Sequence, residues 1–155
     1  MVSVSVTRPN DTTAYTAGDV LGPAEGTAAI AFNGLAFPTG GEIIITSAAL
    51  ERDVTGLVSG ETTYTLHLYS GNPPSALADN AAWDLSSAGD RALYLGSINL
   101  GTPVDLGSTL YVSSDMINKQ VTATSGTIYG YLVTVGGYTP VAQTVLVVSL
   151  HAVQV

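Results

Sequence analysis

Gly, Pro, Thr and Ser interrupt this chain at short intervals, and no long stretch between them has the apolar periodicity of a helix. The runs between the interruptions are short and rich in Val, Ile, Thr and Tyr, residue types that fit a pleated, half-buried surface. The pattern therefore predicts an all-β fold, an antiparallel β-sandwich of about eight strands. That number matches a jelly roll, although the order of the strands does not follow from the sequence.

We expect the strands at residues 2–7, 27–32, 42–53, 62–70, 91–99, 109–113, 127–135 and 143–155. In the fourth of these, Tyr64, Leu66 and Leu68 share one face. The third turns polar at residues 51–53. One or two helical turns are expected near residues 76–83, because this stretch is rich in Ala and Ser75 is placed to cap it. Gly136-Gly137 lies between two strong strands and predicts a hairpin turn.

The strand at 143–155 bears most directly on assembly. Both of its faces are apolar, one with Leu146, Val148, Leu150 and Ala152, the other with Val145, Val147, Val153 and Val155 beside Ser149 and His151. A strand with one solvated face alternates cleanly between apolar and polar residues. We therefore expect one face to meet the sandwich core and the other to meet a neighbouring subunit or a long loop.

Length and charge limit the classes of partner. The 155 residues fit a single domain, 1–155, and the chain has a formal net charge of −8. Its four basic residues are widely spaced, at Arg8, Arg52, Arg91 and Lys119. They form no basic patch, so we expect neither nucleic acid nor an anionic membrane as a partner. The N-terminus lacks the features of a signal peptide, so synthesis in the cytoplasm is expected.

Catalytic patterns are absent from the sequence. There is no Cys and no Gly-x-Ser-x-Gly motif, and the two histidines, His67 and His151, each lie in an expected strand without metal-ligand spacing. We interpret them as structural residues and predict a protein that is not an enzyme and has no cofactor.

Two alternatives for the loop at 75–90 remain open. Asp79, Asp84 and Asp90 are oxygen ligands of the kind that Ca²⁺ prefers, although Asp is also common in turns, which is the interpretation we favour. Four aromatic residues are candidates for a sugar-stacking platform or, as we favour, for packing at the sandwich ends and interfaces. These residues are Tyr64, Tyr69, Trp83 and Tyr94.

Two segments resemble those of a known class of proteins. They are residues 6–22, VTRPNDTTAYTAGDVLG, and residues 66–90, LHLYSGNPPSALADNAAWDLSSAGD. Both are similar to segments of small tailed-bacteriophage virion structural proteins of the capsid decoration (cement) type. The positions that match the shared pattern are Arg8, Pro9, Asp11, Thr12, Tyr15, Asp19, Val20, Pro74, Asp79, Asn80, Ala82 and Trp83. Together the two segments cover about a quarter of the chain.

The resemblance implies a protein on the capsid surface of the virion that binds the major capsid protein, often as a homotrimer, and it brings no catalytic residues. Residues 1–22 would supply a strand and an arm that contacts neighbours. The partner-contact residues expected on this basis are Arg8, Asp11, Tyr15, Asp19, Asp79 and Trp83. From the residues alone, the segment after the first strand is equally consistent with an ordinary loop.

Three functions follow as hypotheses. The first is a decoration protein that stabilises the phage head. The second is a tail, baseplate or head-to-tail component, and the third is a carbohydrate-binding module with the same architecture.

Overall fold

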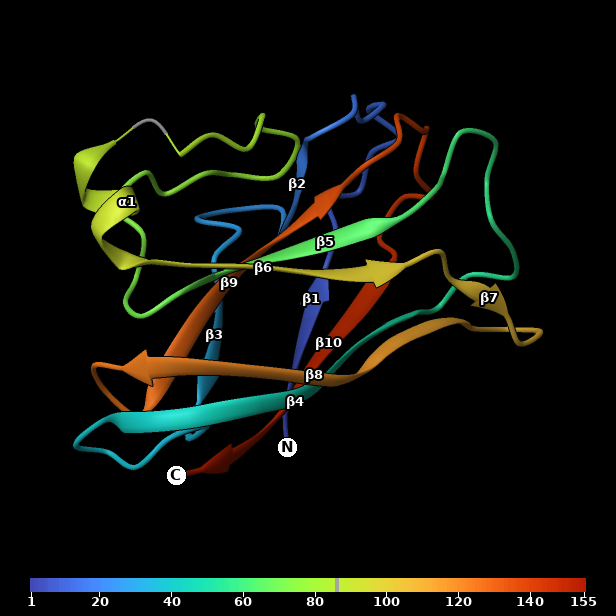
Figure 1. The fold of residues 1–155 in the computed structure, drawn as a ribbon. Coiled ribbons are helices and arrows are strands. Elements are labelled where there is room, and N and C mark those ends of the chain that lie inside the picture. The colour runs from blue at the N-terminus through green and yellow to red at the C-terminus, as the bar shows by residue number, and fades with distance from the viewer. Residues whose placement is uncertain (86) are drawn as a thin grey trace.

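The computed structural model describes residues 1–85 and 87–155, which form two antiparallel sheets packed on each other (Figure 1). The first sheet has the order β1-β10-β4-β8-β7, and the second has the order β2-β9-β5-β6, with β3 also paired to β9. The first consists of β1 (Val2–Thr7), β4 (Gly41–Arg52), β7 (Val104–Asp105), β8 (Leu110–Ala123) and β10 (Val145–Gln154). The second consists of β2 (Val20–Leu21), β3 (Ile30–Asn33), β5 (Tyr64–Tyr69), β6 (Tyr94–Gly101) and β9 (Thr127–Thr134).

This is the jelly-roll-like antiparallel sandwich that the sequence predicts. Among the described residues, eight strands are longer than two residues, which agrees with the expected number, and β2 and β7 are short additions. The predicted boundaries of β1, β4, β5, β9 and β10 hold to within about two residues.

The core between the sheets follows from the alternation of side chains. In β5, Tyr64, Leu66 and Leu68 are fully buried and belong to the cluster between the sheets. In β10, Leu146 and Leu150 belong to the same cluster. Complete burial of one such aliphatic side chain is worth about 1.5–3 kcal/mol. The core is therefore built from the faces that the sequence marks as apolar.

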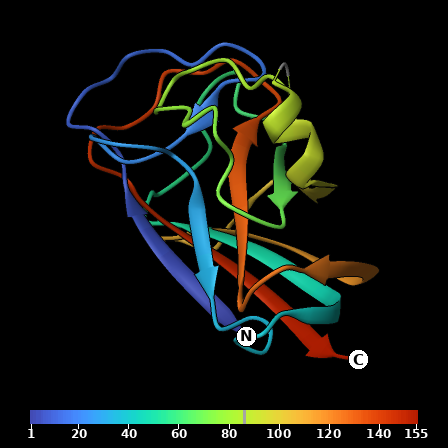
Figure 2. The ribbon, with the colours of Figure 1, turned by 90° about the vertical axis from the view of Figure 1, so that its left-hand side faces the viewer.

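The outer faces of the two sheets differ. A second apolar cluster covers the outside of the β2-β9-β5-β6 sheet, where Tyr69, Tyr131 and Val133 pack under the segment 77–94. In Figure 2, α1 and the long loops gather on this sheet and at the upper end of the sandwich. On the outside of the first sheet, Val147 of β10 is half-buried and Val153 is 52% exposed. No segment of the described chain buries that face completely, so a neighbouring subunit there stays a prediction.

The predicted helix at 76–83 is wrong, because the backbone of this segment pairs with other loops. The carbonyl oxygens of Leu77 and Ala81 accept hydrogen bonds from the amides of Ala28 and Val20, respectively. In addition, Ala76 and Asn80 have positive φ values, 48° and 61°. The helix lies further on, as α1 (Ala88–Leu93), and its N-cap is Ser87, which accepts a hydrogen bond from the Asp90 amide. Residues 91–93 are consequently helical, although the strand was predicted to begin at 91.

Two strand predictions differ in length. β3 begins at Ile30, whereas the sequence predicts a start at residue 27. β8 continues to Ala123, ten residues past the predicted end. Its middle is polar and contains a wide bulge, in which residues 116–118 stand opposite Thr46 alone. Such a bulge interrupts the alternation by which a strand is recognised.

The hairpin predicted at Gly136-Gly137 is also wrong, because β9 and β10 lie in different sheets. These glycines instead let two loops approach closely. A Cβ atom on Gly136 would lie 2.4 Å from the carbonyl oxygen of Gly60 and 2.6 Å from Oγ1 of Thr62. The connection is therefore a crossing between sheets that requires a residue without a side chain.

We expect the Gly136→Ala variant to lose about 1–3 kcal/mol of its free energy of unfolding, because the added methyl group must displace backbone. Gly71→Ala is the matched control. Its Cβ would meet only the side chain of Leu93, at 3.4 and 3.6 Å, so a change within about 0.5 kcal/mol is expected. Urea denaturation measures the free energy of unfolding of both variants. Equal values for Gly136→Ala and Gly71→Ala would contradict the close approach of Gly136 to Gly60 and Thr62.

Candidate interaction surface

The segment after β1 folds back over its own domain. Its amides donate to three carbonyl oxygens at the end of β9 and on the chain that follows it: Arg8 to Thr144 at 3.0 Å, Tyr15 to Tyr138 at 2.9 Å and Gly18 to Thr134 at 2.8 Å. In Figure 1 this segment lies at the upper end of the sandwich. The arm expected within residues 1–22 therefore lies against its own chain here, and a contact between its outer side and a neighbour stays a prediction.

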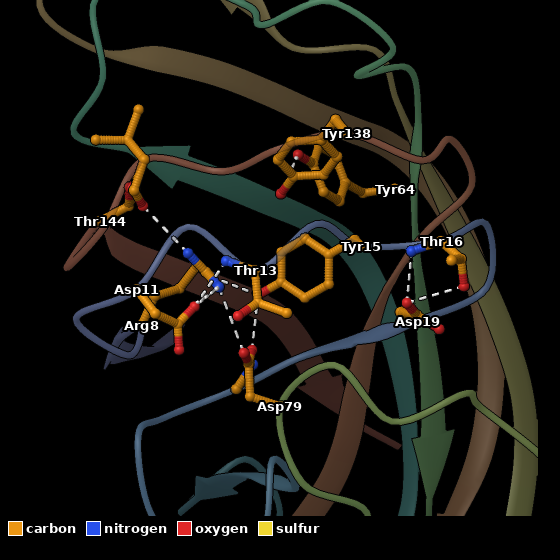
Figure 3. Close-up of polar contacts among 12 residues, drawn as sticks. Arg8, Asp11, Thr13, Tyr15, Thr16, Asp19, Tyr64, Asp79, Tyr138 and Thr144 are labelled. Carbon is orange, nitrogen blue, oxygen red and sulfur yellow. Dashed lines mark hydrogen bonds and ion pairs between the residues drawn. The ribbon is translucent and has the colours of Figure 1, made fainter.

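Arg8, Tyr15 and Asp79 form a buried polar cluster that holds this segment in place (Figure 3). The Arg8 side chain is completely buried, and its Nη2 lies 3.4 Å from Oδ2 of Asp79. Arg8 Nε donates to the Tyr15 hydroxyl, which in turn donates to Oδ1 of Asp79 at 2.7 Å. The same Oδ1 accepts the Gly22 amide at 2.7 Å. Asp79 thus joins the N-terminal segment to the loop at 77–81.

Burial raises the pKa of the Tyr15 hydroxyl, and the hydrogen bond to Asp79 raises it further. The hydroxyl is therefore protonated near neutral pH and can donate to the carboxylate.

The other three predicted partner-contact residues lie around this cluster. Asp11 is at its edge, with a half-exposed side chain whose Oδ1 is 3.9 Å from Arg8 Nη2. Asp19 is buried and accepts the amide and hydroxyl of Thr16 at 2.5 and 3.0 Å. Trp83 is half-buried, and its amide donates to the carbonyl of Gly18. Arg8, Tyr15 and Asp19 are buried in the fold, and contact of the six predicted residues with a partner stays a prediction.

A second buried cluster, which the sequence did not indicate, lies beside the first. Arg52 forms an ion pair with Glu61, and both side chains are almost entirely buried. The Tyr64 hydroxyl donates to Oε1 of Glu61 at 2.6 Å and lies 3.1 Å from the Tyr138 hydroxyl. The Tyr138 ring also packs on Tyr15, at 5.3 Å between ring centroids, so the two clusters are continuous. No spacing motif distinguishes Arg52 and Glu61 from ordinary surface residues.

The four candidate sugar-stacking aromatics do not form one exposed platform. Tyr64 and Tyr69 are fully buried, and they lie in different apolar clusters. Trp83 stacks on His67 at 3.7 Å between ring centroids, and its Nε1 donates to the Tyr69 hydroxyl. The Tyr94 hydroxyl oxygen lies 3.0 Å from Nδ1 of His67. This arrangement matches the packing interpretation.

The three candidate calcium ligands are held by separate contacts. Asp79 belongs to the Arg8 cluster, Asp90 accepts from the Ser75 amide and from Ser87, and Asp84 is exposed. Within residues 1–85 and 87–155, no group of three or more His, Cys, Asp or Glu side chains is arranged to hold a metal.

Burial lowers the pKa of His67 from 6.5 to about 4. Between these values the unfolded chain binds the proton and the folded chain does not, so stability falls as the pH falls from 6.5 towards 4. We expect a loss of about 1 kcal/mol between pH 7 and pH 4.5, after allowance for solvent near the half-buried ring. Urea denaturation, monitored by the fluorescence of Trp83, measures the free energy of unfolding at each pH. The His67→Phe variant should lose this pH dependence and His151→Gln should keep it; identical curves for all three proteins would contradict the assignment.

A pocket of about 280 Å³ opens beside the Arg8 cluster. Three segments line it: the start of the N-terminal segment, the loop after β2 and the loop at 78–80. The lining residues are Pro9, Asp11, Thr13, Pro23, Ala24, Gly26, Ala78, Asp79 and Asn80. Both segments singled out in the sequence therefore meet at this pocket.

No protein-family model matches the sequence, and no curated protein matches it either. Solved structures share parts of its layout. The capsid of Ralstonia phage GP4 matches with a TM-score of 0.45 and 15% identity, covering 99% of this chain and 83% of that chain. The K3 cleaved adhesin domain of Lys-gingipain from Porphyromonas gingivalis matches with a TM-score of 0.35 and 13% identity, covering 99% of this chain and 74% of that chain.

The Israeli acute paralysis virus particle gives a TM-score of 0.39 at 11% identity, covering 99% of this chain and 71% of that chain. All three TM-scores are below 0.5, so the likenesses assign neither a family nor a function to this chain. Among the described residues, no helix has the length and apolarity needed to cross a membrane.

Proposed function

We propose that this protein is a bacteriophage capsid decoration (cement) protein that binds the outer surface of the capsid lattice and stabilises the head. The observation that carries the proposal is the incompletely covered outer face of the β1-β10-β4-β8-β7 sheet. Cross-strand pairing aligns Ser5, Val147, Glu51, Tyr111 and Val104 in one row across all five strands. A neighbouring row consists of Ser3, Ser149, Ala49 and Ser113.

These rows suit a protein interface. Their side chains are mostly small or apolar, and they include one carboxylate and no Lys or Arg. Another subunit can therefore cover the face without desolvating many charges. We propose that the face mediates self-association, as a homotrimer, and that the trimer binds the major capsid protein at the capsid surface.

The mechanism is stabilisation by binding. A protein that binds the assembled shell and not its separated subunits shifts the equilibrium towards the shell by mass action. Heads that lack this protein should therefore release their DNA at a lower temperature than decorated heads, and adding the purified protein back should restore the difference. Unchanged stability of the undecorated heads would refute a cement role.

Copy number separates this function from a tail, baseplate or head-to-tail role. A decoration protein should be present at a level comparable with that of the major capsid protein, as measured by quantitative mass spectrometry of purified virions. A much lower level would favour the tail or connector role.

The Ala49→Arg variant tests the face itself. Ala49 lies between Ser149 and Ser113 on the central strand, so a long charged side chain there should abolish self-association while leaving the core intact. Light scattering should give about three times the 15.8 kDa chain mass for the parent protein and the chain mass for the variant. The control is Ser97→Arg, at an exposed position of β6 in the other sheet. This variant should remain associated. A monomeric parent protein would contradict the trimer.

A further inference from the structure

β1 is an edge strand with an open outer side. It lies at the border of the first sheet, and within the described chain it pairs with β10 alone (Figure 2). Its six residues pair with β10 in one continuous register, without a bulge. A regular open edge of this kind is a template on which another strand can add to the sheet.

The other edges of the two sheets are interrupted. β7, β2 and β3 are only two, two and four residues long. β8, beside β7, contains the bulge opposite Thr46 and carries Lys119, and the register of β6 with β5 shifts at two places. Short strands, bulges and lysines are the devices that keep sheet edges from pairing with other chains. The sequence of β1, VSVSVT, contains no charge and no proline.

The hydrogen bonds at the end of β1 show which backbone groups face its open edge. The Arg8 amide donates to the carbonyl of Thr144, which lies opposite when the register of β1 and β10 is continued. The carbonyl of Val145, opposite Thr7, instead accepts from Asp53, on the other side of β10. Bonded and non-bonded pairs alternate along an antiparallel ladder. The even-numbered residues of β1 therefore bond to β10, and the backbone groups of the odd-numbered residues point outward.

These outward groups are free to accept a partner strand. Among residues 1–85 and 87–155, none bonds to the outward amides and carbonyls of Ser3, Ser5 and Thr7, and all three residues are exposed. The three valines of β1 pack against the core but are only partly buried. An added strand would pair the backbone groups and complete the burial of the valines.

The sequence of β1 is complementary to itself. Residues 2–6 read Val-Ser-Val-Ser-Val in both directions. When two copies pair antiparallel about Val4, each Val2 faces Val6 of the other copy and each Ser3 faces Ser5. Valine then meets valine on the core side, and serine meets serine on the outer side. The outward-pointing Ser3 and Ser5 become the hydrogen-bonded pairs of the new ladder, so backbone and side chains agree on one register.

We propose that β1 pairs antiparallel with β1 of a second copy of this chain, about a two-fold axis at Val4. The two five-stranded sheets would become one continuous sheet of ten strands. The inference goes beyond the proposed function and does not rest on it, because a two-fold contact joins two copies and would link one trimer to the next. Six residues on each side are too few to bury the roughly 1,200 Å² of a stable interface. The pairing therefore forms at high protein concentration and leaves the mass in dilute solution unchanged.

Disulfide trapping tests this pairing in the full chain, because the chain has no cysteine of its own. In the proposed register, Val4 faces Val4 of the second copy at a non-hydrogen-bonded position, where Cα atoms lie about 4.5 Å apart and a disulfide can form. With oxidised glutathione at high protein concentration, Val4→Cys should give a linked species of twice the 15.8 kDa chain mass. Absence of this species would overturn the proposal.

Val2→Cys and Val6→Cys are matched controls on the same partly buried face of β1. In the proposed register, each of these cysteines lies about 13 Å or more from its equivalent in the second copy, too far for a disulfide. Each variant alone should cross-link at least about tenfold more slowly than Val4→Cys. A mixture of the two should form the mixed dimer readily, because Val2 faces Val6. Equal rates for all three variants, or a mixture no faster than its components, would overturn the register.

A proline tests whether the backbone takes part. In the Val4→Cys background, Ser5→Pro removes an outward N–H from each copy and leaves the ladder with β10 intact. Cross-linking should slow at least about fivefold, since the two-fold contact loses two hydrogen bonds. Ser5→Ala keeps the N–H and should cross-link at the rate of Val4→Cys. An unchanged rate for Ser5→Pro would overturn strand pairing.

Ala49→Arg separates this edge from the outer face of the sheet. That substitution is expected to abolish association through the outer face, so Val4→Cys should still cross-link when it is combined with Ala49→Arg. Loss of the cross-link would mean that the cysteines meet through the outer face and would overturn the edge proposal. If the parent protein is a monomer in dilute solution, the proposed trimer fails, while the cysteine comparison still decides the edge pairing.

Discussion

The Glu61→Ala variant is expected to lose about 3–5 kcal/mol of its free energy of unfolding. Removing the carboxylate leaves the Arg52 guanidinium inside the protein without a counter-charge, because Arg52 is only 1% exposed. The Tyr64 hydroxyl and the Val58 amide lose their acceptor at the same time. Arg52 Nε already has no partner among the described residues, so the site has no spare acceptor with which to compensate.

Two further variants show that the loss comes from the uncompensated charge. Asp84→Ala removes an exposed carboxylate away from this cluster and should change stability by no more than about 0.5 kcal/mol. The double variant Arg52→Met with Glu61→Leu replaces both charges by apolar side chains and should recover most of the loss. Urea denaturation of the four proteins completes the comparison. A loss below about 1 kcal/mol for Glu61→Ala would mean that water reaches Arg52.

The buried position of Arg52 shows where sequence reasoning was sufficient and where it was not. Alternation predicted which residues of β5 share the core face and separated the two faces of β10, because the apolar faces of these strands are strong. The end of β4 was interpreted as polar, since residues 51–53 are all charged. The same alternation, applied to its end, places Arg52 on the inner face with Leu50, and its partner Glu61 comes from a loop whose path depends on the fold.

The segment 76–83 illustrates a second limit. Helix propensity is local and favoured a helix there, but backbone groups of residues 77–81 form hydrogen bonds with Val20 and Ala28, which lie 49 to 61 residues earlier in the chain. Long-range pairing of this kind overrides a weak local preference. It also brings Asp79 to Arg8 and Tyr15. The fold thus brings together three of the residues that the resemblance selected, and their contact with a partner stays a prediction.

The two buried clusters explain how a chain with few basic residues keeps its N-terminal segment ordered. Only four residues are basic, and two of them, Arg8 and Arg52, are buried in ion pairs at the upper end of the sandwich. Tyr138 packs against Tyr15 on one side and Tyr64 on the other, with ring centroids 5.3 and 6.4 Å apart. Loss of either ion pair should thus affect the order of the segment at residues 8–19.

The Asp79→Ala variant is expected to release that segment and to lower the free energy of unfolding by about 3 kcal/mol. The Arg8 guanidinium would lose its counter-charge, the Tyr15 hydroxyl would lose its acceptor, and the Gly22 amide would be left unpaired. Because the loss is concentrated at residues 8–22, local opening should become easier than global unfolding.

Chymotrypsin cleavage after Tyr15 measures this opening directly, since Tyr15 is only 2% exposed in the folded protein. Each 1.4 kcal/mol of lost local stability raises the open population tenfold, so cleavage of Asp79→Ala should be at least about tenfold faster than in the parent. Asp84→Ala, at an exposed site, should be cleaved at the parent rate. Unchanged cleavage of Asp79→Ala would show that backbone hydrogen bonds alone hold the segment. Faster cleavage together with weaker head binding would mean that the order of this segment, and not only its sequence, is needed at the capsid.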